Sequence, residues 1–455
     1  MSALILLSVL GVVLMFMGLR GMRDKLLPVA VAGLLGALAL LVAGRGLEWP
    51  VLTDGMMRFD GYALGFSRAL VVFTLLLFLF AIDYYSKVRE NVAEILALMI
   101  FALVGAVVMA GYTNLLVLFL AVEVMSIPLY ILAGGKRDSL RSGEASIKYF
   151  LQGSFASGFF LLGIALVYGS CASFDLATVQ AHAAAAGADD RLFLLGLFFT
   201  ISGLAFKVAA VPFHFWSPDV YEGSPTLITA YMNTVVKTAA FAAFYRLIEH
   251  MQLPFAVHAM LLLMTACTLL LGNLVALRQT HFKRLLAYSA IAHTGFLMLA
   301  LLSPGPRTPD VLYYYLVTYA LATVGLFIVL TITKRASRGD EHIRTFRGMF
   351  RTAPWVAIVT MLLLLSLAGI PLTAGFLAKY RVFMLSLEAG YLWTTGLAVL
   401  MALVGIYYYV IVIREAFTPQ PDALPLRVST VNWVLISLCG IAVVLFAVMP
   451  QWLAL

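Results

Sequence analysis

Stretches of about twenty apolar residues recur along almost the entire chain, and this pattern restricts the possible folds more than any motif does. Apolar residues make up 63% of the 455 residues and charged residues only 11%, with a mean hydropathy of +1.01. The hydrocarbon core of a bilayer is roughly 30 Å thick, and a backbone inside it must form its hydrogen bonds within its own segment. The pattern therefore predicts an all-α integral membrane protein and excludes a soluble domain.

Charged or Pro/Gly-rich breaks divide the sequence into about fourteen predicted transmembrane helices. These spans fall near residues 3–19, 26–44, 63–82, 94–111, 113–133, 145–169, 191–216, 225–249, 255–277, 284–303, 310–333, 353–384, 391–413 and 429–450. Basic residues follow the first span at Arg20, Arg23 and Lys25 and do not precede it. We therefore expect a retained helix there and no cleaved signal peptide.

Lys and Arg are concentrated in the loops on one side of the predicted bundle. With the N-terminus outside, 19 of the 30 basic residues fall in inner loops, 6 are assigned to the outer side and 5 lie within spans. Because basic loop residues are held on the cytoplasmic side, we predict that both termini lie on the outer side. Topology then accounts for the net charge of +8, and no basic soluble face remains that would bind nucleic acid.

Two segments longer than a simple span carry proline near mid-depth: GLAFKVAAVPFHFWSPDVYEGSP (203–225), with Pro212, and SLAGIPLTAGFLAKYRVF (366–383), with Pro371. Proline removes a backbone donor and frees a carbonyl, so it kinks or interrupts a helix. The two prolines lie in the seventh and twelfth spans, which predicts that these helices are broken and belong to two inverted five-helix repeats. The alternative is that both are ordinary proline kinks.

On this interpretation the chain, 1–455, is a single membrane domain. Flanking N-terminal helices occupy 1–90, the first inverted repeat 91–250 (helices 4–8), the second 251–416 (helices 9–13), and a C-terminal helix 417–455.

Four ionisable residues stand alone in apolar stretches: Glu123, Lys207, Lys237 and Lys379. A charge near the bilayer centre costs at least about 2.5 to 3.5 kcal/mol, and such residues commonly mark ion or proton pathways. Desolvation disfavours the charged form of an amine, which brings a buried lysine closer to exchanging protons near neutrality. We therefore predict proton translocation through these four residues, with Glu123 and Lys207 as a switchable pair.

Three further residues are possible relay members. Lys148 lies only a few residues inside its span, so its side chain can equally reach the headgroup region. Histidine changes charge near neutral pH, so His214 and His293 are candidates for relaying protons. A single membrane histidine is, however, at least as often a hydrogen-bonded structural residue. The three cysteines, Cys171, Cys267 and Cys439, have no ligand spacing, so we expect neither a metal site nor a cofactor within this chain.

Several strings resemble the antiporter-like membrane subunits of respiratory complex I, the NADH-quinone oxidoreductase. They are AVEVMSIPLYILAG, EASIKYFLQGSFASGFFLLGIALVYG, SGLAFKVAAVPFHFWSPDVYEGSPT, RLLAYSAIAHTGF and SLAGIPLTAGFLAKYRVF, and the similarity spans about residues 90 to 415. Within this family, lysine at position 379 is the pattern of the N and L subunits. The L subunit continues past its fourteenth helix into a long lateral helix, whereas this sequence stops at Leu455, so the chain looks most like the N type.

The resemblance implies a fourteen-helix core with a proton path along a central polar axis. It matches Glu123 to the family's fifth-helix glutamate, Lys207 and Lys237 to the lysines of the seventh and eighth helices, and Lys379 to that of the twelfth. The sequence departs from the common pattern in Leu227, where many relatives have proline, in Ala378, where glycine is common, and in Arg381, an additional charge near Lys379.

The implied function is that of a non-redox, proton-translocating subunit of NADH:quinone oxidoreductase in a bacterial inner membrane. NADH, flavin, iron-sulfur clusters and quinone are then expected in partner subunits, which include further antiporter-like subunits. The first alternative is a subunit of a multisubunit sodium/proton antiporter or of a membrane-bound hydrogenase. A second alternative is a structural membrane scaffold whose charges hold neighbouring subunits.

Overall fold

The computed structural model describes residues 1–44, 55–86, 91–185, 189–421, 423 and 425–455. Within this part of the chain the regular elements are helices, accompanied only by isolated β-bridges. Arg45, Lys87 and Arg89, which contribute to the predicted charge asymmetry, lie outside the described residues.

The helices follow the order of the predicted spans. Their bounds are α1 Ser2–Leu19, α2 Arg23–Val42, α4 Gly61–Tyr84, α5 Val92–Gly111, α6 Leu115–Ala133, α7 Leu140–Cys171, α8 Leu176–Ala185, α9 Arg191–Val208, α10 Trp216–Gly223, α11 Thr226–Tyr231, α12 Lys237–Ile248, α13 Phe255–Ala276, α14 Phe282–Leu301, α15 Thr308–Ala336, α16 Met349–Thr352, α17 Pro354–Ala368, α18 Ala374–Glu388, α19 Leu392–Phe417 and α20 Thr430–Val448. A π-helical turn, η1 Met232–Val236, joins α11 to α12, and two short 3₁₀ turns occupy η2 Ile343–Phe346 and η3 Pro450–Leu453.

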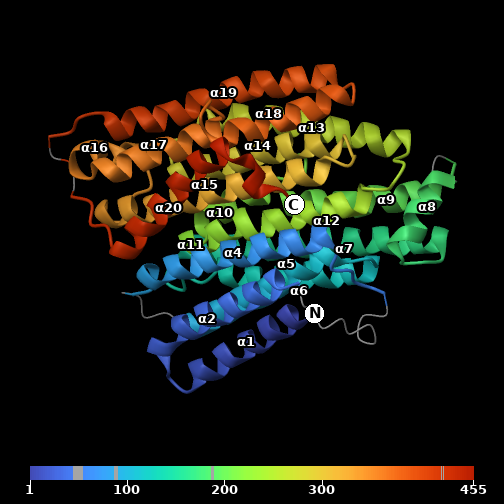
Figure 1. Cartoon of the computed structure of the whole chain (residues 1–455), viewed down its shortest axis with the longest axis horizontal. Coiled ribbons are helices and arrows are strands. Elements are labelled where there is room, and N and C mark those ends of the chain that lie inside the picture. The colour runs from blue at the N-terminus through green and yellow to red at the C-terminus, as the bar shows by residue number, and fades with distance from the viewer. Residues whose placement is uncertain (45–54, 87–90, 186–188, 422, 424) are drawn as a thin grey trace.

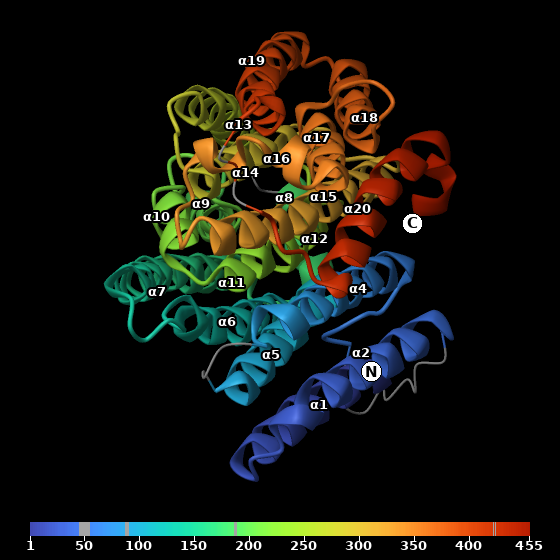
Figure 2. The ribbon, with the colours of Figure 1, turned by 90° about the vertical axis from the view of Figure 1, so that its left-hand side faces the viewer.

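The long helices lie side by side in one bundle (Figure 1). Helices α1 and α2 form one edge and α19 the opposite edge, with α12, α14 and α15 between them, as the end-on view in Figure 2 shows. The segment from α11 to α12 and helix α15 are buried along their apolar length, whereas α1, α2 and α7 expose most of theirs. A helix that is apolar on all sides belongs in the interior of a bundle, so the core of the molecule lies on α12, α14 and α15.

Thirteen helices of the described chain are long and apolar enough to cross a membrane. The difference from the predicted number lies at 353–384, where the structure has two helices of 15 residues each, α17 and α18. The predicted span 191–216 corresponds to α9 and a connection that leads to α10. Sequence reasoning also missed α8 and gave α7 too short a length, because amphipathic or polar turns at a helix end lack the apolar signal on which span prediction relies.

Helices α9 and α17 end in the same way. The N–H of Ala210 donates to the carbonyl of Ala205 (2.9 Å), and the N–H of Ile370 donates to that of Leu365 (3.0 Å). The residue between, Ala209 in one case and Gly369 in the other, adopts a left-handed conformation with φ of 58° and 80°. This backward hydrogen bond across a left-handed residue terminates a helix and turns the chain away from its axis.

Candidate functional site: buried ionisable residues along the bundle

Lys207 lies in the last turn of α9 and is 5% exposed. Its ammonium group donates to the hydroxyl of Ser126 (2.7 Å) and more weakly to that of Tyr130 (3.4 Å), both on α6. It also lies over the ring of Tyr130, 5.6 Å from the centroid. Neutral oxygens and an aromatic face therefore solvate this cation.

Glu123 is half-buried on α6 and accepts a hydrogen bond from Ser157 of α7. In the described structure no ion pair joins it to Lys207, whose partners Ser126 and Tyr130 lie about one and about two helical turns further along α6. The predicted pair thus shares a helix surface without direct contact. A shift in either side chain is needed before the two charges meet.

Lys237 is the first residue of α12, directly after the π-helical turn, and is 3% exposed. Its ammonium group donates to the carbonyl of Ala290 (2.6 Å) and to the hydroxyl of Thr294 (3.2 Å), both on α14. The ring of Tyr319 on α15 lies 5.4 Å from it. Lys237 therefore sits where the three central helices of the bundle meet.

His293 connects this region to the second half of the chain. Its Nδ1 is hydrogen-bonded to the hydroxyl of Tyr315 on α15 (2.7 Å), and its Nε2 lies 3.3 Å from the hydroxyl of Tyr409 on α19. Tyr409 is in turn hydrogen-bonded to Ser289 (2.5 Å). The imidazole lies within electrostatic range of both Lys237 and Lys379. The imidazole thus has a tyrosine hydroxyl at each of its two nitrogens.

Lys379 lies on α18, one turn after that helix begins, and is 5% exposed. Its ammonium group donates to the carbonyls of Leu367 and Ala368 at the end of α17, each at 2.9 Å. The ring of Phe296 covers it from α14, 4.9 Å away. The C-terminal end of a helix carries a partial negative charge, so these carbonyls stabilise the cation directly.

The two prolines explain why acceptors are available at these positions. In an α-helix the carbonyl of residue i bonds the N–H of residue i+4, and proline has no N–H. Pro212 stands four residues after Val208, whose carbonyl accepts instead from Thr294 (2.7 Å). Pro371 stands four residues after Leu367, whose carbonyl accepts from Lys379.

Lys148 and His214 form no hydrogen bond or ion pair with the buried lysines, Glu123 or His293 among the described residues. Lys148 forms ion pairs with Glu144 (2.7 Å) and with Asp219 of α10 (2.8 Å). His214 is buried in the connection between α9 and α10, where its Nδ1 has no hydrogen-bond partner among the described residues and its ring packs on Phe215. Arg381, two residues after Lys379, packs over the ring of Tyr314 at 4.3 Å.

Two further buried basic residues, which the sequence analysis did not single out, lie within helices. Lys283 is 1% exposed in the first turn of α14 and donates to the backbone carbonyls of Glu222 (3.2 Å) and Ser224. Arg246 is 3% exposed in α12 and forms an ion pair with Asp60 (2.7 Å). The apolar run that precedes Arg246 is the sequence feature from which its burial could have been predicted.

Asp60 lies just outside α4 as its N-terminal cap. Burial raises the pKa of the Asp60 carboxyl, but the hydrogen bond from Arg246 and the charges of Arg246 and Arg58 outweigh this and hold the pKa below its usual value. The carboxylate therefore remains charged and fixes the end of α4 against α12.

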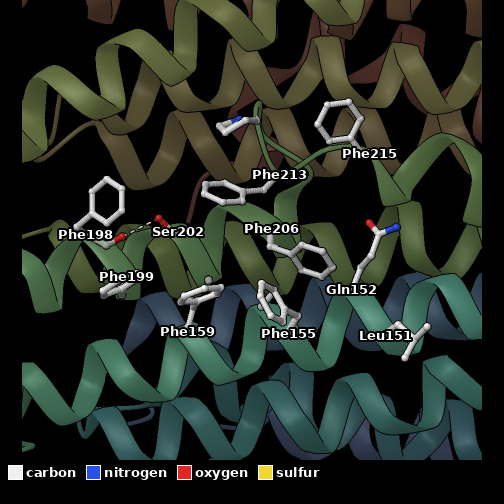
Figure 3. A pocket seen from close by; sticks show the side chains of 13 residues that line it. Leu151, Gln152, Phe155, Phe159, Phe198, Phe199, Ser202, Phe206, Phe213 and Phe215 are labelled. Carbon is white, nitrogen blue, oxygen red and sulfur yellow. Dashed lines mark hydrogen bonds between the residues drawn. The ribbon is translucent and has the colours of Figure 1, made fainter.

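An apolar pocket of about 610 Å³ lies beside the connection between α9 and α10 (Figure 3). Phenylalanines from α7, α9 and the connection line it, among them Phe155, Phe199 and Phe213. Ser202 contributes a hydroxyl, which is already bonded to the carbonyl of Phe198 (2.8 Å). Of the candidate residues only Pro212 belongs to this lining, so the pocket is separate from the buried ionisable groups.

Within the described chain no cluster of three or more His, Cys, Asp or Glu side chains is placed to hold a metal ion. The chemistry that the buried groups support is proton exchange between amines, an imidazole and a carboxylate, through hydroxyl groups.

Comparison with known proteins assigns this arrangement to a family. Residues 113–405 match the model of the NADH:quinone oxidoreductase/Mrp antiporter transmembrane family. NADH-quinone oxidoreductase subunit N of Cytophaga hutchinsonii is 40% identical over 416 residues, covering 90% of this chain and 89% of that protein. Subunit N of Flavobacterium johnsoniae is 35% identical over 433 residues, covering 93% and 92%.

Solved structures share the fold along nearly the whole chain. A chain of respiratory complex I from Thermus thermophilus, determined with bound aureothin, superposes with a TM-score of 0.81 at 33% identity and covers 99% of this chain and 97% of its own. A chain of the Mrp complex from Dietzia sp. superposes with a TM-score of 0.86 at 20% identity, covering 99% and 95%, which shows the fold alone. Together with the sequence relatives, these matches place the chain among the antiporter-like membrane subunits of NADH:quinone oxidoreductase, in the subunit N group.

Proposed function

We propose that this subunit carries protons across the membrane along a row of buried side chains formed by Glu123, Lys207, Lys237, His293 and Lys379. Quinone reduction in partner subunits supplies the free energy. The observation that carries the proposal is His293, which has a tyrosine hydroxyl on each ring nitrogen and lies within electrostatic range of Lys237 and Lys379. An imidazole with two hydroxyl partners can take a proton on one side and release one on the other.

The same proposal assigns α9 with α10, and α17 with α18, as the two halves of broken transmembrane helices in two inverted repeats, 91–250 and 251–416. In support, α9 and α17 end in the same left-handed turn, α9 four residues before Pro212 and α17 three residues before Pro371. Interrupted helices place backbone carbonyls at mid-depth, where they solvate a cation that has no carboxylate partner.

Proton movement then follows changes in pairing. When the ammonium group of Lys207 leaves Ser126 and approaches Glu123, the carboxylate stabilises its positive charge. The electrostatic repulsion that Lys207 exerts on Lys237 then becomes weaker. The π-helical turn before Lys237 supports such movement, because π-turns in helices frequently occur at functional sites. Lys148 and His214 are assigned to the approach from the loops carrying most of the basic residues, which we place on the cytoplasmic side, with both termini on the outer side of a bacterial inner membrane.

We test the row with Lys207→Met and Glu123→Gln, each in the assembled complex. Both variants should assemble, as judged by migration on a native gel, and should lose at least about tenfold in protons moved per NADH oxidised, since the loss of a relay group removes a transfer step. Lys25→Met, which changes an exposed lysine at the start of α2, is the matched control. Full pumping in both relay variants would exclude this row.

Two other functions predict different results. If the chain is a scaffold, the relay variants should fail to assemble and the assembled fraction should pump normally. If it is a sodium/proton antiporter subunit, as the shared fold of the Mrp complex permits, proton movement should depend on sodium and persist without NADH. We favour the complex I assignment because the relatives at 35–40% identity are subunit N proteins. The same assignment places NADH, flavin, iron-sulfur clusters and quinone in partner subunits.

A further inference from the structure

A second pocket, of about 730 Å³, opens at the end of the bundle where the loops after α6, α10, α13 and α15 meet. None of the residues of the proposed proton row lines it, and most of the residues that do are charged or polar. We name it the basic pocket; its charged lining residues are Lys136, Arg141, Glu222, His281, Lys283, Lys334, Arg335, Arg338, Asp340 and Glu341.

The carboxylates of the basic pocket are already engaged. Glu341 forms an ion pair with Lys334, and Glu222 with Arg284 (2.6 Å). Asp340 accepts from the backbone N–H of His342 (2.9 Å). Arg335 is paired with Asp83.

The remaining cations of the pocket have no carboxylate partner in the described part of the structure. They are Lys136, Arg141, Lys283 and Arg338. None of these four cations forms an ion pair with a described residue, and the only carboxylates that act on Lys283, those of Glu341 and Glu222, are themselves paired with other cations.

Lys283 and Ser224 form the buried wall of the pocket. Lys283 is 1% exposed, and its ammonium group donates to two backbone carbonyls, which solvate a charge without neutralising it. At longer range, Glu341 and Glu222 attract this ammonium group, whereas Lys334 and Lys136 repel it. Ser224 is 2% exposed, and its Oγ has no hydrogen-bond partner among the described residues. A buried hydroxyl without a partner is costly, so this one is available to donate to a ligand.

We propose that the basic pocket binds a phosphate-class oxyanion, held by Lys136, Arg141, Lys283 and Arg338 and by the hydroxyl of Ser224. Phosphate oxygens accept charge-assisted hydrogen bonds from amines and guanidinium groups and also accept from hydroxyls, which matches this lining. The same chemistry is offered by free inorganic phosphate and by the headgroup of an anionic phospholipid. The inference does not depend on the proton row, since none of its residues lines the basic pocket.

The experiment measures saturable binding of radiolabelled inorganic phosphate by equilibrium dialysis. The whole complex is held in nanodiscs of a neutral lipid, phosphatidylcholine, and separately in nanodiscs containing phosphatidylglycerol. Lys136→Gln combined with Arg338→Gln should weaken phosphate binding by about a hundredfold, because each charge-assisted hydrogen bond is worth roughly tenfold. Ser224→Ala should weaken it by about tenfold on the same basis.

The matched control is Arg137→Gln, which removes the same charge from the same loop but from a residue that does not line the pocket. Phosphate binding in neutral nanodiscs that is lost in the double variant and kept in the control supports the free anion. Loss of that binding when phosphatidylglycerol is present, with anionic lipid retained by the wild-type complex and not by the double variant, identifies the headgroup as the natural source. Equal phosphate and lipid binding in wild type and double variant, or no binding of either, overturns the proposal.

Discussion

The ends of α9 and α17 have the same backbone turn but place their lysines on opposite sides of it. At the end of α9 the lysine, Lys207, belongs to the helix that terminates, and it points to hydroxyls on α6. At the end of α17 the lysine, Lys379, belongs to the helix that follows, and it donates back to the terminating carbonyls. The carbonyl freed at Val208 is instead satisfied by the neutral hydroxyl of Thr294.

This difference separates two ways of holding a cation inside a membrane. Lys207 has polar side chains as partners and a carboxylate, Glu123, nearby on the same helix as those partners. Lys379 has backbone carbonyls and an aromatic ring, and no carboxylate within ion-pair distance in the described structure. The first arrangement can change through side-chain rotation, whereas the second holds its cation on a rigid helix end.

The largest expected difference is between Lys379→Met and Lys207→Met. Both should stop proton movement, but only Lys379→Met leaves two buried carbonyls without a donor. An unsatisfied buried acceptor costs about 1–3 kcal/mol, so this variant should lower the free energy of unfolding by roughly 2–4 kcal/mol more than Lys207→Met does. Thermal unfolding of the purified complex, followed for this subunit, measures the difference. Equal destabilisation by the two changes would mean that the carbonyls of Leu367 and Ala368 find other donors.

The residue in the left-handed turn gives the next comparison. Gly369→Ala should destabilise the protein by about 2 kcal/mol, because a left-handed alanine costs about 1–2 kcal/mol and its Cβ would lie 2.8 Å from Cδ of Lys379. The reciprocal change, Ala209→Gly, should stabilise by up to about 1 kcal/mol, since it removes the same strain. The unfolding midpoints of both variants test whether Gly369→Ala destabilises the protein and Ala209→Gly stabilises it. A destabilising Ala209→Gly would show that unfolded-state entropy outweighs the strain.

Thr294→Val tests the neutral donor at the end of α9. The substitution keeps the shape of the side chain but removes the hydroxyl that donates to Val208 and accepts from Lys237. We expect a loss of about 1–2 kcal/mol in unfolding free energy and slower proton movement, because two buried groups each lose a partner. Thr294→Ser, which retains the hydroxyl, should behave like the wild type in both measurements.

The smallest expected effect concerns the starts of the two helices. Asp190 caps α9, and hydrogen bonds from Ser170 and from the N–H of Phe193 lower the pKa of its carboxyl to about 2, whereas α17 starts at Pro354 without a side-chain cap. Since the pKa is lowered by folding, this stabilisation is present above about pH 4 and is lost as the pH falls towards 2. Asp190→Ala should cost about 1 kcal/mol at neutral pH and less at pH 2, where about half of the folded-state carboxyl is protonated. A cost that does not change with pH would contradict the capping role.

Much of the fold follows from the sequence because span length and hydropathy are local properties. The predicted spans agree with the helices to within a few residues over most of the chain, and they fail where a helix continues in polar residues, as in the first turns of α7. The predicted interruptions at Pro212 and Pro371 rest on the same local logic, since a missing N–H is a property of one residue.

The surroundings of the candidate residues could not be predicted in the same way. The sequence selects Lys207 and Lys379 because each is a charge in an apolar run, but their partners come from other helices and depend on how those helices pack. Lys283 was missed because its burial depends on the loop after α10, which covers it. Likewise, the sequence predicts Glu123 and Lys207 as a switchable pair, but it does not reveal the serine that each of them contacts in this structure.

The backbone partners of Lys379 have a consequence for genetics and for evolution. A carbonyl group does not take up a proton at physiological pH, so its attraction for the ammonium group ends only when Lys379 releases its proton or when its side chain and α17 move apart. An alanine scan of every position would also leave both oxygens of Leu367 and Ala368 in place. The counterpart of this lysine is therefore hidden from side-chain mutagenesis and from covariation between positions, and only the path of the main chain reveals it.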